Sequence, residues 1–103
     1  MASEKECSTK ARYHELKIHP GPFILVLHDL KKAEFRNNDR GFKEGHTLIL
    51  KEYNPLMAAY TGNYIFRKVT HVQTGYGIPE GYAMLSIRPL TKEEEADHAA
   101  GGA

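Results

Sequence analysis

The sequence predicts a small α+β domain in which one early helix accompanies a sheet of mostly antiparallel strands. Segments of alternating polar and apolar residues recur along the chain and are separated by turn residues, which is typical of strands joined by hairpins. One apolar run near the N-terminus follows prolines and has helical spacing instead. The length of 103 residues is enough for one domain and too short for two.

The first two predicted elements are a strand over residues 13–18 and a helix over residues 22–31. In the strand, one face carries Tyr13, Glu15 and Lys17, and the other carries His14, Leu16 and Ile18. Pro22 suits the first turn of a helix, where its missing N–H costs nothing. The helical apolar set is Phe23, Ile24, Leu27 and Leu30. The β-branched content of this run leaves a buried strand as the alternative.

Four further strands are predicted after the helix, separated by turn residues. They cover residues 33–36, 47–53, 60–72 and 81–88. Residues 37–41 have turn chemistry, because Asn and Asp bond their own backbone and Gly permits a positive φ. The element order β-α-β-β-β-β predicts a small curled sheet or barrel.

The domain is expected over residues 11–90, between a flexible tail at 1–10 and a flexible acidic tail at 91–103, for which a frayed helix is the alternative. The formal net charge of +1 gives a weak overall field, so an anion site has to come from local clustering. The single cysteine, Cys7, excludes an internal disulfide, and the N-terminus has no signal-peptide pattern. The longest apolar run is far shorter than a membrane span. We therefore expect a cytoplasmic protein with no membrane contact, and a monomer.

No metal or other cofactor is expected. The six histidines are His14, His19, His28, His46, His71 and His98. None of them forms an HExxH motif or a close pair on one helix face. A structural role is therefore favoured for each, and a non-local cluster around His14, His28 and His71 is the alternative.

Four segments carry a resemblance to a known family: HELKIHPGPF, DLKKAEFRNNDRGFKEGHTLILKEY, YTGNYIFRKVTHV and GYAMLSIRPL. Together they resemble a small bacterial and phage domain family of unknown function that is related to the ASCH domain, in the PUA-like superfamily. Lys31, Glu34 and Arg36 match the ASCH signature G-x-K-x-x-E-x-R, while Asp29 replaces its Gly. The resemblance implies a PUA-like β-barrel with the helix plugging one end, a cleft lined by the signature, and RNA or a nucleoside as ligand.

The same signature opens a cationic stretch over residues 31–43. Five cationic and two anionic side chains give this stretch a net charge of +3. Such a cluster binds RNA in a salt-dependent way, and Arg can hold a phosphate through two hydrogen bonds. Glu34 and Arg36 share one face of their strand, as a structural ion pair or as ligand-holding groups. The alternative for the whole stretch is a solvated charged turn.

We therefore expect an RNA-binding PUA-like module with a basic cleft. Its candidate ligand-binding residues are Lys31, Lys32, Glu34, Arg36, Asn38, Asp39, Arg40, Lys43 and Tyr76. Tyr76 enters as an exposed aromatic ring in a Gly-rich loop, where it could stack on a base.

Two alternatives stay open. The first is a small hydrolase that acts on RNA or on a modified nucleoside in the same cleft, with Lys31 as the catalytic residue. The resemblance implies a Thr three residues after that lysine in the amidohydrolase branch, and Glu34 stands there instead. The second alternative is a phage-related protein-interaction domain, in which the cationic stretch meets an acidic partner.

Overall fold

The computed structural model describes residues 13–96, so the predicted N-terminal tail with Cys7 and the end of the acidic tail lie outside the described residues. The predicted bounds of the domain, 11–90, stay a prediction. The elements are β1 (Tyr13–Ile18), α2 (Pro20–Leu27), β2 (Ala33–Asn37), β3 (Thr47–Asn54), β4 (Ala59–Gln73) and β5 (Tyr82–Arg88). All five predicted strands are thus confirmed to within two residues at each end.

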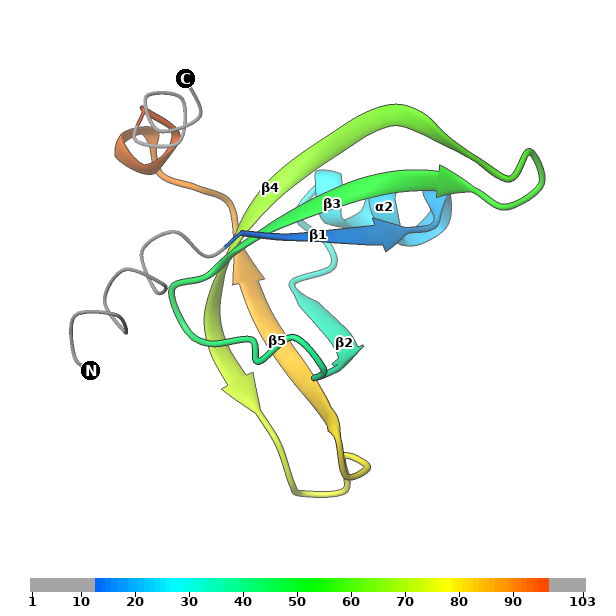
Figure 1. Cartoon of the computed structure of the whole chain (residues 1–103). Coiled ribbons are helices and arrows are strands. Elements are labelled where there is room, and N and C mark those ends of the chain that lie inside the picture. The colour runs from blue at the N-terminus through cyan, green and yellow to red at the C-terminus, as the bar shows by residue number, and fades with distance from the viewer. Residues whose placement is uncertain (1–12, 97–103) are drawn as a thin grey trace.

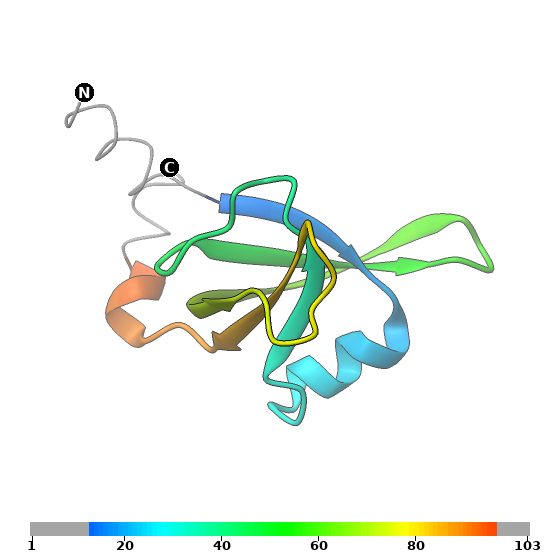
Figure 2. The ribbon, with the colours of Figure 1, turned by 90° about the horizontal axis from the view of Figure 1, so that it is seen from below.

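The strands form one curled sheet in the order β1-β3-β4-β5-β2. Strand β1 pairs with β3 in parallel, and the other three pairings are antiparallel. Figures 1 and 2 show the sheet curling around the core, with the β3–β4 hairpin extending beyond it as an arm. The predicted small curled sheet with mostly antiparallel strands is therefore confirmed, and it forms a half-barrel with one parallel pair. The parallel pair arises because α2 and β2 lie between β1 and β3 in the chain, which gives the long crossover that parallel neighbours need.

The half-barrel is open because its two outermost strands, β1 and β2, do not pair with each other. Arginine side chains bridge them instead. Arg36 Nη2 donates to the carbonyl of Lys17 at 2.7 Å, and Arg40 Nη1 donates to that of Glu15 at 2.8 Å. These alternate carbonyls of β1 lie on its unpaired edge, where an exposed strand leaves its backbone unsatisfied. We call this junction of β1 and β2 the seam.

The helix is confirmed in type, but it covers Pro20–Leu27 and not residues 22–31. Pro20 occupies the first turn, where its missing N–H costs nothing. Of the predicted apolar set only Phe23 is buried, with Val26 as its partner one turn on. The other three members, Ile24, Leu27 and Leu30, are exposed. A helix of two turns meets the sheet along one narrow line, so only two positions reach the core.

A tight C-terminal turn ends α2 and directs the chain into β2. The N–H of Asp29 donates to the carbonyl of Val26, and the N–H of Leu30 donates to that of Leu25. This is the Schellman arrangement, which requires a left-handed residue at the position of Asp29. Asp29 has φ 60°, so the residue that replaces the signature Gly adopts the backbone conformation that glycine favours. A side chain of β4 also bonds the end of α2, since Arg67 Nη2 donates to the carbonyl of Val26 at 2.9 Å. Burial lowers the pKa of Arg67, and the negative charge of nearby Asp29 opposes that shift.

A pair of substitutions at Asp29 tests this turn. We expect Asp29→Gly to leave the free energy of unfolding within about 0.5 kcal/mol, because relief of the left-handed strain offsets the larger entropy of an unfolded glycine. Asp29→Val is expected to cost about 1–2 kcal/mol, because a β-branched residue tolerates this φ poorly. Urea unfolding measures both. Equal stability of the two variants would contradict the strained turn.

The core lies inside the curl of the sheet and is closed by α2. Its buried residues are Leu16, Ile18, Phe23, Val26, Phe42, Leu48, Leu50, Val69, Ala83, Leu85 and Ile87. Alternation explains most of them, since β1 and β5 bury every second residue.

Residues 92–96 form a second helix, in the segment for which a frayed helix or a flexible tail is expected. The N–H of Glu94 donates to the Thr91 hydroxyl, and the N–H of Thr91 donates to the Glu94 carboxylate, which makes a capping box. Arg88 binds the same carboxylate through two hydrogen bonds of 2.8 Å. This hydrogen bonding from Arg88 lowers the pKa of Glu94 to about 2.

Among residues 13–96, no helix is long and apolar enough to cross a membrane.

Candidate functional site

A buried carboxylate organises the start of β2. Glu34 is 5% exposed, in a position that alternation directs to the inside of the sheet. Lys31 Nζ lies 2.9 Å from Glu34 Oε1 and also donates to the carbonyl of Ala33. Arg36 Nε donates to Glu34 Oε2 at 2.8 Å, and Arg36 Nη2 forms an ion pair with the same oxygen at 2.6 Å. The three residues that resemble the ASCH signature therefore form one cluster, which we call the signature triad.

The signature triad lines a hollow of about 380 Å³ at the seam. We call it the seam hollow. Its lining residues are Lys17, Ile18, His19, Pro22, Lys31, Glu34, Phe35 and Arg36. The volume lies within the range of small-ligand sites. The hollow thus combines the end of β1, the first turn of α2 and the start of β2.

Some hydrogen-bond donors that line the seam hollow are not bonded to any group among residues 13–96. Lys31 uses two of its three N–H groups inside the protein, and Arg36 Nη1 has no acceptor among residues 13–96. The side chains of Lys31 and Arg36 are 31% and 23% exposed, so their outer ends reach solvent. Lys17 also lines the hollow, while its ammonium lies over the Tyr53 ring, 4.1 Å from the ring centroid. Lys31 and Arg36 against one buried carboxylate give the hollow a net positive charge, which suits an anionic group.

The structure separates the other residues of the cationic stretch from this hollow. Lys32 and Asp39 are exposed, and Lys43 is exposed in the loop before β3. Arg40 bonds the edge of β1. Asn38 lies at the far end of β2, where its Oδ1 accepts from the N–H of Phe42 at 3.0 Å. The stretch predicted to line one cleft is therefore divided along β2.

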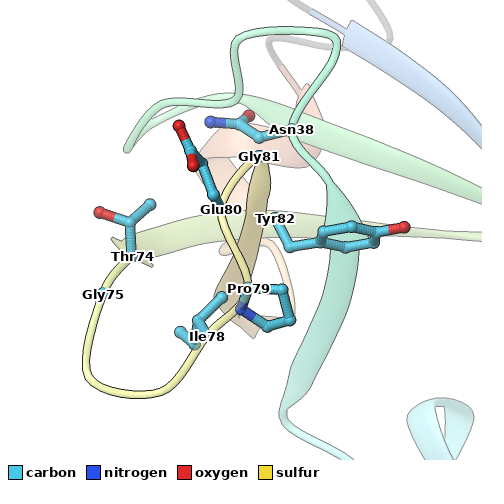
Figure 3. Close-up of a pocket in the computed structure, with 8 residues that line it drawn as sticks. All are labelled: Asn38, Thr74, Gly75, Ile78, Pro79, Glu80, Gly81 and Tyr82. Atoms are coloured by element: carbon cyan, nitrogen blue, oxygen red, sulfur yellow. The ribbon is translucent and has the colours of Figure 1, made fainter.

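Asn38 belongs to a second hollow, of about 430 Å³, at the loop between β4 and β5. We call it the loop hollow. Its lining residues are Asn38, Thr74, Gly75, Ile78, Pro79, Glu80, Gly81 and Tyr82, as Figure 3 shows. Tyr76 is 95% exposed, as predicted, but it does not line either hollow.

Two features were missed because they depend on strand register. The rings of Phe35 and Tyr82 stack with centroids 5.3 Å apart and planes within 9°. His14 and His46 meet in the interior, with Nε2 of the first 3.0 Å from Nδ1 of the second. The N–H of Lys43 also lies 3.2 Å from His46 Nδ1, so His46 contacts both β1 and the loop before β3.

The histidine pair has a structural role in this arrangement, since it fixes the loop before β3 against β1. The alternative cluster of His14, His28 and His71 does not form, because His71 bonds Glu44 and Gln73 instead. Among residues 13–96, no group of three or more His, Cys, Asp or Glu side chains is placed to hold a metal ion.

Comparison with known proteins defines the family. The profile of DUF3850, a domain of unknown function, matches residues 13–87, which include the signature triad and every strand except Arg88, the last residue of β5. The chain belongs to the DUF3850 family. It is also 38% identical over 86 residues to the "Uncharacterized 12.9 kDa protein in GpA 3'region" of Escherichia phage P2, a match that covers 79% of this chain and 77% of the phage protein. The resemblance to a small phage-related domain family is therefore confirmed.

Proposed function

We propose that this DUF3850 domain is an RNA-binding module with a PUA-like half-barrel, and that its seam hollow holds an RNA phosphate. The observation that supports the proposal is the signature triad. A buried carboxylate that binds two cations fixes their positions before any ligand arrives, which reduces the entropy lost on binding. The donors that remain on Lys31 and Arg36 suit phosphate oxygens.

RNA is favoured over a free anion for two reasons. The ASCH-like signature implies RNA or a nucleoside, and the hollow lies on an edge strand that an extended polymer can follow. The proposed site residues are the triad and Lys17, with Asn38 directly after β2. Lys32 and Lys43 are exposed and remain candidates for outer phosphate contacts, whereas Arg40 bonds the edge of β1 and Asp39 carries a negative charge.

The test is fluorescence anisotropy of labelled short RNAs at two salt concentrations. We expect wild-type binding to weaken steeply with salt, and Arg36→Gln to lower affinity about tenfold and to reduce the slope of log K against log salt by about 0.7. Arg40→Gln is the matched control, because Arg40 also bonds a β1 carbonyl but does not line the hollow. Equal losses in both variants would contradict a phosphate site at the hollow.

The second candidate is a hydrolase that uses the same hollow. The observation that favours it is the close contact of Lys31 Nζ with the buried Glu34 carboxylate, 2.9 Å away. A denaturing gel of each binding sample decides between the two. Shortened RNA with wild type, and intact RNA with Lys31→Ala, would establish the enzyme. Neither binding nor cleavage would redirect the search to modified nucleosides and protein partners.

A further inference from the structure

The Phe35–Tyr82 stack lies on the outer face of the sheet. Phe35 faces Met84 and Tyr82 faces Asn37 in the antiparallel register of β2 and β5, so the two rings are diagonal neighbours. Inward positions of the same strands hold Glu34, Arg36, Ala83 and Leu85. Both rings remain well exposed, Phe35 at 47% and Tyr82 at 38%. The pair therefore presents aromatic surface to water, although it gains some stability from ring contact.

The stack connects the two hollows. Phe35 lines the seam hollow and Tyr82 lines the loop hollow. Between them runs β2, a five-residue edge strand that spans about 16 Å at 3.3 Å per residue. Along this one strand the surface changes from cationic, to aromatic, to a mainly apolar hollow with a polar rim. An extended chain that crosses the edge of β2 would meet these three surfaces in order.

The loop hollow offers both a donor and an acceptor. The Oδ1 of Asn38 is engaged by Phe42, which fixes the amide and leaves Nδ2 as a donor. Figure 3 shows the Asn38 amide and the Glu80 carboxylate at the same rim, with Ile78 and Pro79 below them. A neighbouring donor and acceptor above an apolar surface match the polar edge and flat face of a nucleobase.

We infer that the ligand is an unpaired RNA segment, with one base stacked on Phe35 and Tyr82 and the adjacent nucleotide in the loop hollow. This inference rests on the proposed function, since the phosphate at the seam hollow sets the register of the strand. Stacking requires a base that is splayed out of a helix, so duplex RNA does not fit the path. Every base has a flat face, so the stack binds RNA without strong sequence preference.

The experiment compares a labelled single strand of about 12 nucleotides with a duplex of the same sequence. Wild type is expected to prefer the single strand. Tyr82→Leu is expected to weaken single-strand binding about tenfold or more and to leave the salt slope unchanged, because it removes a stacking surface and no charge. Tyr82→Phe keeps the ring and is expected to retain affinity. Tyr64→Leu is the matched control, since Tyr64 is 57% exposed and lies outside both hollows.

The outcomes separate this inference from the proposed function. Loss of affinity in Tyr82→Leu with an unchanged salt slope supports the stack. Wild-type affinity in Tyr82→Leu, alongside a loss in Arg36→Gln, overturns the stack and leaves the phosphate site. Equal affinity of wild type for duplex and single strand also overturns it. If wild type binds no RNA, the proposed function and the inference both fall. Should Tyr82→Leu not fold, Phe35→Leu removes the other ring and answers the same question.

Discussion

Glu34→Ala is expected to lower the free energy of unfolding by about 3 kcal/mol, because it leaves two cations without their buried partner. Glu34 is 5% exposed and accepts hydrogen bonds from both Lys31 and Arg36. Its removal also opens a space at the inner face of β2 and releases the two side chains to move. RNA affinity should therefore fall together with stability, even though the substitution makes the domain more positive.

Urea unfolding measures this effect, with Glu15→Ala as the matched control. Glu15 also pairs with a lysine, but its side chain is 66% exposed and lies 3.5 Å from Lys51. An exposed pair of this kind contributes between about zero and 1 kcal/mol. If Glu34→Ala were no more destabilising than Glu15→Ala, the signature triad would not be a preorganised cluster, and the proposed phosphate site would lose its support.

Local patterns explain what could be predicted from the sequence. Alternation alone places Leu16 inside and Lys17 outside, because successive side chains of a strand point to opposite faces. The same rule predicts that Glu34 and Arg36 share a face, and the structure confirms their ion pair. These conclusions need only the period of a strand and no knowledge of its neighbours.

The same reasoning could not predict which distant strands pair. The choice of β3 as the partner of β1 determines both the parallel register of that pair and the opening at the seam. For this reason the sequence predicted one cleft, whereas Asn38 lies in a different hollow from Arg36. The Phe35–Tyr82 stack depends on the register of β2 against β5, which no local pattern reveals.

The residue at the turn after α2 is a local feature of the sequence that only the backbone geometry explains. Asp29 occupies the glycine position of the signature, and its φ of 60° shows why a glycine suits that position. The turn aims Lys31 towards Glu34, three residues on. A residue other than glycine thus adopts the left-handed backbone that this turn requires.

Leu85→Ala is the second large effect that we expect, at about 3 kcal/mol of unfolding free energy. Leu85 is fully buried and lies beside Glu34 on β2 and Val72 on β4. The substitution leaves a cavity that the surrounding strands only partly close, so it loses packing as well as apolar burial. The cavity also lies next to the Glu34 carboxylate, and water that enters it weakens the electrostatic attraction between Glu34 and its two cations.

Leu56→Ala is the control for this change, because Leu56 is 95% exposed in the turn between β3 and β4. The same atoms are removed there without leaving a cavity, so stability should change by less than about 0.5 kcal/mol. Thermal and urea unfolding compare the two variants, and RNA anisotropy at a temperature where Leu85→Ala stays folded reports on the site. Weaker RNA binding by folded Leu85→Ala would show that the packed core behind β2 helps to hold Lys31 and Arg36 in place. Unchanged affinity would show that the carboxylate does so even when water reaches it.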